Sequence, residues 1–267
     1  MLNFHKAHAY GNDFIYVREE DVAGAAVSPL ARELCDRHAG IGADGLIVYG
    51  GDRRRCRMRL FNADGGRAEV SGNGLRGLAA VVLAGERGAD GHVTIETDAG
   101  PKRLVSMGWD GARQVFRAGM GAPLGLRGDV AVSAAGEHLR VVELNMGNPQ
   151  CVLLGPLPDD ARFSRLGPAL ERHEHFPNGT NVEFAMVEAP DRVRILIWER
   201  GVGPTSSSGT GSCAALVAAA AFGGAARDAD VLAPGGAQRV EWREDGVYLT
   251  GWAEVLCTGQ WMRPLPV

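Results

Sequence analysis

The chain has no CxxC pair, no block of charge of one sign and no apolar run long enough to cross a membrane. Its five cysteines are scattered along 267 residues, which favours reduced thiols in a cytoplasm over a disulfide framework. The longest apolar stretch, AALVAAAAFGGAA (214–226), is shorter than the roughly 20 residues of a membrane-spanning helix. The opening MLNFHKAHAYGND lacks the apolar segment of a secretion signal. We therefore expect a cytoplasmic protein with no membrane partner.

The charge balance also gives no sign of a nucleic-acid partner. With 28 Lys and Arg against 32 Asp and Glu, the formal net charge is −4. The densest basic patch, RRRCRMR (53–59), includes apolar residues and is typical of a strand with one solvated face. The histidines of HEH (173–175) have a spacing that suits no common metal motif. We predict no nucleic acid and no metal.

The chain contains an internal repeat. GNDFIYV from Gly11 matches GNPQCVLL from Gly147, and GLIVY from Gly45 matches NVEFAMV from Asn181, each 136 residues apart. At offsets of 137, RMRLFNADG (57–65) matches RILIWERGVG (194–203), which sets Asn62 opposite Glu199, and Ser71 of SGNG matches Ser208 of SGTG. Ordered matches at a near-constant spacing indicate a duplicated unit.

Each copy has several short strands and one strongly apolar helix, expected at 75–85 and 212–223. The predicted fold is α/β, with two pseudo-symmetric domains that each wrap a strand-rich sheet around a central helix. We place the domains at 1–120 and 121–267, with a linker in GMGAPLGLRGD (119–129), and the last strand could pack back on the first domain. Ligands favour the cleft between such halves, which is where we expect the active site.

The paired SGxG loops predict an anion site. Each serine precedes a helix whose first backbone N–H groups and positive dipole end attract a carboxylate. Two such ends would stabilise the charge that builds on a carboxylate when the neighbouring carbon loses a proton. Side chains on both faces of that carbon would invert it.

Two other interpretations of these loops remain open. Serine is a favoured helix N-cap, so each loop taken alone is an ordinary helix start. GNGLRG (72–77), with Asp98 about 20 residues on, also spells a dinucleotide-binding fingerprint. That nicotinamide-dependent oxidoreductase is disfavoured, because polar NADGGRAE separates the strand from the glycines and the second copy lacks the third glycine.

The sequence resembles the diaminopimelate epimerase family. The resemblance rests on NADGGRAEVSGNGLR and ERGVGPTSSSGTGSCAA, with HAYGNDF, GIGADG, MGNPQCV and FPNGTNVEF in the family's order, and it covers essentially the whole chain. It implies a cofactor-independent isomerase with a small amino-acid substrate, often a homodimer. Such enzymes interconvert LL- and meso-diaminopimelate for lysine and cell-wall synthesis by a two-base mechanism.

The resemblance also implies roles for individual residues. Arg200 would bind the distal carboxylate, and Glu199 would meet the distal ammonium or orient a catalytic group. The backbone amides of 72–74 and 209–211 would hold the reacting carboxylate. The implied substrate-binding residues are Asn12, Asn62, Gly72, Asn73, Asn148, Asn181, Arg200, Gly209 and Thr210, and the implied catalytic residues are Ser71, Ser208 and Glu199.

The chain departs from the family pattern at the residues that move the proton. The family has cysteine at both positions where this chain has Ser71 and Ser208, and it has His and Gln where this chain has Gln150 and Gly45. A thiol pKa of about 8.5 lies well below that of a serine hydroxyl. A gap of about five units corresponds to some 7 kcal/mol. Cys213 is retained, but at a position that is not the catalytic thiol.

Three accounts of the serines remain open. Both cysteines could have been exchanged to trap a substrate complex, although Gln150 and Gly45 argue against this. The chain could be a natural variant that works through the serines, with Glu199 or Glu69 assisting. It could also be a one-base isomerase or lyase, or a catalytically silent amino-acid-binding homologue. We favour an epimerase that converts LL- to meso-diaminopimelate.

Overall fold

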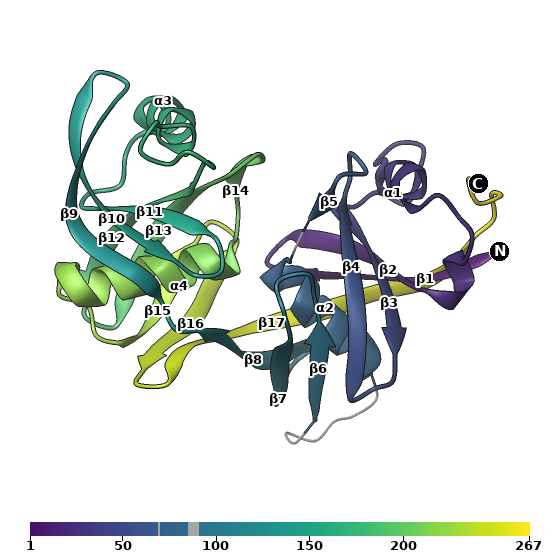
Figure 1. The fold of residues 1–267 in the computed structure, drawn as a ribbon. Coiled ribbons are helices and arrows are strands. Elements are labelled where there is room, and N and C mark those ends of the chain that lie inside the picture. Colours follow the sequence, from purple (N-terminus) through teal and green to yellow (C-terminus); the bar gives the residue numbers. More distant parts are fainter. Residues whose placement is uncertain (69, 85–90) are drawn as a thin grey trace. The chain divides into compact units, whose positions relative to one another are not determined.

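The computed structural model describes residues 1–68, 70–84 and 91–267 and divides the chain into two compact units (Figure 1). Unit 1 comprises residues 1–118 and 251–267, and unit 2 comprises residues 119–250. The C-terminal residues that belong to unit 1 lie in the long strand β17 and the segment after it, and β17 pairs there with β1, Leu2 lying opposite Trp261.

The elements of the two units follow in chain order. Those that begin in unit 1 are β1 (Leu2–Ala9), β2 (Asn12–Arg18), the 3-10 turn η1 (Glu20–Val22), α1 (Val27–Cys35), β3 (Gly45–Gly51), β4 (Arg55–Asn62), β5 (Arg67–Ala68), α2 (Gly72–Val82), β6 (His92–Glu96), β7 (Lys102–Asp110) and β8 (Arg113–Gly121). Those that begin in unit 2 are β9 (Leu124–Ala134), β10 (Glu137–Asn145), β11 (Pro149–Leu154), α3 (Asp160–Glu171), β12 (Asn181–Ala189), β13 (Arg192–Glu199), β14 (Gly203–Thr205), α4 (Gly209–Ala218), the π-helical turn η2 (Ala219–Gly223), β15 (Asp228–Ala233), β16 (Gly236–Arg243) and β17 (Gly246–Trp261).

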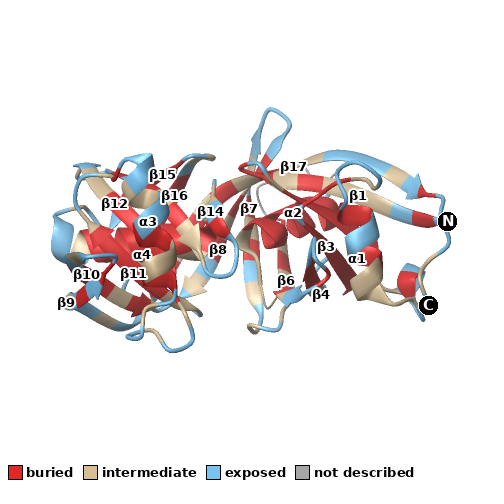
Figure 2. Cartoon of the chain, turned by 90° about the horizontal axis from the view of Figure 1, so that it is seen from above, coloured by how far each residue is buried: buried red, intermediate tan, exposed pale blue. Residues whose placement is uncertain are grey.

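Each unit surrounds one apolar helix with strands. In unit 1 the ladder runs β17-β1-β2-β3-β4-β6-β7-β8, and β8 pairs in turn with β17. Helix α2 is buried along nearly its whole length, and α4 of unit 2 is buried in the same way (Figure 2). Apart from the buried Asn73 and Arg76 of α2, both helices consist of small and branched residues that strands can pack around on every side. The predicted strand-rich sheet around a central helix is confirmed.

The strand register shows the duplication residue by residue. Phe14 of β2 lies opposite Gly45 of β3 in a parallel pair, and Gln150 of β11 lies opposite Asn181 of β12 in the equivalent pair. Both partners differ by 136, the offset found in the sequence. Likewise β4 pairs with β6 and β13 with β15 in parallel. The repeat is therefore present in the structure as well as in the sequence.

The structure differs from the sequence expectations in two places. The stretch 119–129, expected to be a linker, lies mainly in β8 and β9, because its alternating residues extend strands across the glycines. Each unit also has a second helix, α1 or α3. Leu30, Ala31 and Leu34 bury one face of α1, an amphipathic pattern that differs from the nearly continuous burial of α2 and α4.

Gly77 gives a prediction about packing in unit 1. A Cβ at Gly77 would collide with the hydroxyl of Tyr16, which is fully buried and donates to Gly74 O at 3.1 Å. The equivalent residues of unit 2 are Ala214 and Val152, a larger helix residue against a smaller strand residue. We expect Gly77→Ala to lower the free energy of unfolding by roughly 1–3 kcal/mol. Chemical denaturation should show a smaller penalty in a Tyr16→Val background, and equal penalties in both backgrounds would contradict this packing.

Candidate active site

The implied site residues fall into two groups, one in each unit. Group 1 centres on Ser71 at the start of α2, and group 2 centres on Ser208 at the start of α4. In both groups the serine is the helix N-cap: Ser71 Oγ accepts from Gly74 N at 3.1 Å, and Ser208 Oγ accepts from Gly211 N at 3.2 Å. The capping interpretation is correct for both serines, and it leaves each hydroxyl proton free to point away from the helix.

The serine caps also determine which of the backbone amides implied for the reacting carboxylate already have a hydrogen-bond partner. The amides of Gly74 and Gly211 donate to the serines. The first backbone hydrogen bonds of the helices begin one residue later, at Leu75 N and Ser212 N. The amides that remain for the predicted anion site are the two that precede each capped one, those of Gly72 and Asn73 in group 1 and of Gly209 and Thr210 in group 2.

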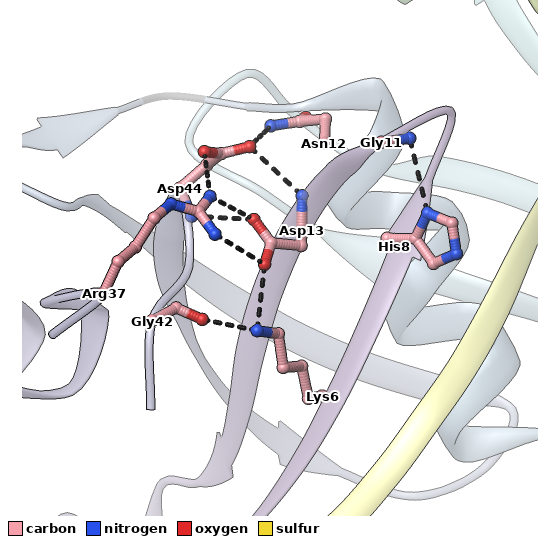
Figure 3. A network of polar contacts seen from close by, with 8 residues as sticks. All are labelled: Lys6, His8, Gly11, Asn12, Asp13, Arg37, Gly42 and Asp44. Carbon is pink, nitrogen blue, oxygen red and sulfur yellow. Dashed lines mark hydrogen bonds and ion pairs between the residues drawn. The ribbon is translucent and has the colours of Figure 1, made fainter. Parts of the chain in front are cut away.

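Asn12 of group 1 belongs to a polar network. Its amide nitrogen donates to Asp44 Oδ2 at 2.7 Å, and its oxygen accepts from Asn73 Nδ2 at 3.2 Å. Arg37 bridges Asp44 and Asp13 (Figure 3). Burial alone would raise the pKa of Asp13, but hydrogen bonds from Arg37 and Lys6 outweigh it and lower this pKa. The ionised network holds Asn12 and Asn73 together at the start of α2.

Other predicted residues of group 1 are less closely connected. Asn62 is exposed at the end of β4, and its backbone, not its side chain, makes the recorded contacts to Gly65 and Gly66. Gly45 lies opposite Asn62, and a Cβ there would meet the carbonyl oxygen of Phe61 at 2.7 Å. A larger side chain at 45 would thus require the backbone to shift. Glu69 lies outside the described residues.

Group 2 places a carboxylate against its serine. Glu199, at the end of β13, forms a hydrogen bond with the side chain of Ser208. Ser208 is only 6% exposed. Burial raises the pKa of Glu199, and the hydrogen bond from Ser208 opposes that rise without cancelling it. Glu199 is thus a stronger base than an exposed glutamate, and it lies beside the hydroxyl that the repeat aligned with Ser71.

The remaining predicted residues of group 2 differ in what their side chains contact. Asn148 Nδ2 donates to Thr210 Oγ1 at 3.4 Å, which repeats the Asn73–Asn12 contact of group 1. Asn181 donates to Pro149 O and accepts from Arg200 N, at 3.2 and 2.9 Å. Its amide therefore braces the backbone. The Arg200 guanidinium is exposed and donates to Asn178 O at 3.0 Å.

Sequence reasoning missed Glu183, a wholly buried carboxyl group on β12. A Cβ at Gly211 would lie 2.7 Å from Glu183 Oε1 and 3.2 Å from Ser208 Oγ, so both atoms line the first turn of α4. Burial raises the pKa of Glu183 well above its usual value, and the nearby Glu199 raises it further. Its signal was a single glutamate inside the apolar strand NVEFAMV, where a charged residue is costly unless it has a partner.

No helix in the described ranges is long and apolar enough to cross a membrane. Within the same ranges, His, Cys, Asp and Glu side chains form no group of three or more that could hold a metal ion.

Solved structures of epimerases and racemases share the fold. A protein described as a predicted epimerase from Pseudomonas aeruginosa superposes with a TM-score of 0.74 at 17% identity, covering 99% of this chain and 100% of that one. A probable proline racemase from Agrobacterium radiobacter gives 0.72 at 15% identity, with 98% and 93% coverage. The chain therefore has the fold of these two structures.

The sequence comparisons identify the family. The model of the family described as diaminopimelate epimerase matches residues 4–123 and 142–256. A diaminopimelate epimerase of Desulforudis audaxviator is 41% identical over 98% of this chain and 100% of its own length. One of Desulfitobacterium hafniense is 39% identical, with 95% and 96% coverage. The chain belongs to the diaminopimelate epimerase family, and its enzyme class is isomerase.

Proposed function

We propose that the chain inverts the α-carbon of LL-diaminopimelate to give the meso form, without a cofactor, by proton transfer at Ser71 and Ser208. The observation that carries the proposal is the pair of N-cap serines at equivalent places of the duplicated units, in a chain of this family. The reaction requires that both hydroxyls reach the same α-carbon from opposite faces. Lysine and peptidoglycan synthesis would use the product.

The free helix amides would carry the electrostatic part of the reaction. Removal of the α-proton places negative charge on the adjacent carboxylate, and amides of Gly72, Asn73, Gly209 and Thr210 would stabilise it. Oriented backbone donors of this kind are worth about 10²–10³-fold each in rate. Asn12 and Asn148, which contact the first helical turns, would orient the reacting end of the substrate, and the exposed Arg200 guanidinium would bind the distal carboxylate.

Glu199 gives Ser208 a route to act as a base without forming a free alkoxide. The Cα–H bond breaks as its proton passes to Ser208 Oγ, while the original hydroxyl proton of Ser208 passes to the Glu199 carboxylate. The carbanion is then protonated from the other face by the Ser71 hydroxyl, which regains a proton from solvent while Glu199 releases its proton to solvent. In the reverse direction, protonated Glu199 returns its proton to Ser208 as Ser208 protonates the carbon.

One observation favours a second candidate, a one-base isomerase. The position of Glu199 in unit 2 corresponds to Asn62 in unit 1, which is a poor base. If Ser71 cannot transfer a proton, the chain would exchange the α-proton at one face only.

We further propose a cytoplasmic homodimer, as the family resemblance implies.

Proton NMR of LL-diaminopimelate with the protein in D₂O tests the function directly. We expect the α-proton signal of LL-diaminopimelate to decline as the meso form grows, with deuterium in the product. Ser71→Ala and Ser208→Ala should each abolish inversion. Exchange that keeps the LL configuration would support the one-base candidate instead. No exchange at high protein concentration would overturn both.

A further inference from the structure

Glu183 and Gln150 form a buried polar pair that the fold itself does not require. Val152 lies opposite Glu183, and Gln150 lies opposite Asn181, in the parallel ladder of β11 and β12. The equivalent residues in unit 1 are Phe14 and Ile47, and the Ile47 side chain lies under Gly74 as Glu183 lies under Gly211. The same architecture is thus stable with two apolar residues. A buried acid and amide in unit 2 therefore call for a reason beyond folding.

The atoms around the Gln150 amide allow either of two orientations, which exchange its oxygen and nitrogen, and the first of them requires a neutral Glu183. With its oxygen toward Glu183, Gln150 Nε2 donates to Asn148 Oδ1 at 2.6 Å. In that orientation the two facing oxygens need a proton between them, so Glu183 must be the neutral acid and donate to Gln150 Oε1.

With its nitrogen toward Glu183, Gln150 instead donates to Oε1 and Oε2 at 2.9 and 3.2 Å, which suits an ionised carboxylate. Its oxygen then accepts from Thr210 Oγ1 at 3.2 Å and from Asn181 Nδ2 at 3.3 Å. The same oxygen comes to 2.6 Å from the Asn148 terminal atom, so Asn148 must also turn and present its nitrogen there.

We propose that Glu183 is a positioning residue whose proton sets the orientation of the Gln150 and Asn148 amides, and so exchanges the donor and acceptor that Asn148 offers the substrate. The role of Asn148 toward substrate rests on the proposed function, whereas the coupling of Glu183 to the two amides does not. With Glu183 neutral the chain of hydrogen bonds runs from Glu183 through Gln150 and Asn148 to Thr210. With Glu183 ionised the donors are reversed: Thr210 and Asn148 donate to the Gln150 oxygen, and the Gln150 nitrogen donates to Glu183.

The ionisable groups around Glu183 favour the neutral state. Glu199 on β13 faces it, Cys151 on β11 is raised in pKa by burial and by Glu183, and Glu143 on β10 acts on Cys151 as well. Helix α4, which packs on this face of the sheet, brings Cys213 and no charged residue. The positive end of α4 acts in the other direction, toward the carboxylate. Burial and the neighbouring Glu199 carboxyl outweigh it.

The test is an NMR titration of the substrate-free protein between pH 5 and 9. We expect the Glu183 side-chain carbonyl carbon to titrate above the ordinary glutamate range, and the side-chain amide signals of Gln150 and Asn148 to follow the same curve. In Glu183→Gln these amide signals should become independent of pH. Glu188→Gln, a change at the exposed glutamate of the same strand, should leave the titration intact.

Amide signals that stay constant while Glu183 titrates would overturn the proposal, and so would a Glu183 that stays in one state across the range. The wild-type titration decides this even if Glu183→Gln fails to fold, and it needs no turnover. Calorimetry then tests whether the protonation of Glu183 changes the affinity for the ligand. The affinity for diaminopimelate should change about tenfold along the Glu183 curve, the size expected for one hydrogen bond, and should lose that dependence in Glu183→Gln.

Discussion

Replacing Ser71 and Ser208 together by cysteine should raise the rate of diaminopimelate epimerisation by about 10³-fold or more. A thiol with a pKa near 8.5 supplies some thiolate at neutral pH, whereas a serine hydroxyl supplies essentially no alkoxide. The full gap of about five pKa units would allow roughly 10⁵-fold. We expect less, because a general base contributes about 10²–10⁴-fold, and Glu199 already assists Ser208.

The single variants separate the two faces. Ser71→Cys should produce the larger gain, because the equivalent of Glu199 in unit 1 is Asn62 and Ser71 has more to recover. Ser206→Cys is the matched control, since it adds a thiol two residues from Ser208 at an exposed position outside the helix cap. Initial rates by NMR or a coupled assay measure the gain. A double variant no faster than wild type would show that the serine positions do not transfer the proton.

The duplicated fold could be predicted because its signals are local and occur twice. SGNG and SGTG each start a helix with a capping serine and a glycine that permits close packing, and the strand repeats keep their offset of 136 or 137 residues. Helices α1 and α3 were missed because each buries only one face, whereas α2 and α4 are buried on nearly every side. The strands across 119–129 were missed because glycine, a weak strand former, dominates that segment.

The site could be predicted only as far as residue types and motifs reach. Ser71, Ser208 and Glu199 stand inside the repeat and the family motifs. Glu183 stands in an apolar strand, and only tertiary packing shows that it lies under the first turn of α4 beside Ser208. Asn181 is the opposite case. Its position in the motif suggests a substrate-binding side chain, whereas its amide contacts backbone atoms of Pro149 and Arg200.

Glu199→Gln should slow epimerisation by about 10²–10⁴-fold, the usual contribution of a general base. Glutamine preserves the shape and can still contact Ser208, but it cannot accept the hydroxyl proton when the α-carbon is deprotonated. The matched control is Glu188→Gln, which removes an exposed carboxylate that pairs with Arg194. Its rate should stay within a factor of two of wild type.

The pH profile distinguishes a base from a merely structural glutamate. Glu199 must be ionised to accept the proton, so wild-type activity should fall as the pH drops through the raised pKa of this residue. Because Glu183 and Glu199 interact, that pKa belongs to the pair. In Glu199→Gln the residual activity should no longer fall at low pH. A profile that keeps this fall would show that another group is responsible for it.

Isotope exchange is the sharper test, because proton transfer at one face of the α-carbon can be lost while transfer at the other face is kept. Loss of Glu199 disables the face served by Ser208 and slows inversion in both directions, since forward and reverse reactions both pass through the transition state for proton transfer at Ser208. The diastereomer whose α-proton faces Ser71 should nevertheless exchange deuterium from D₂O and keep its configuration, to the extent that Ser71 can act as a base. If Glu199→Gln lowers exchange from both diastereomers equally, Glu199 serves the whole site through binding, and the relay through Ser208 is wrong.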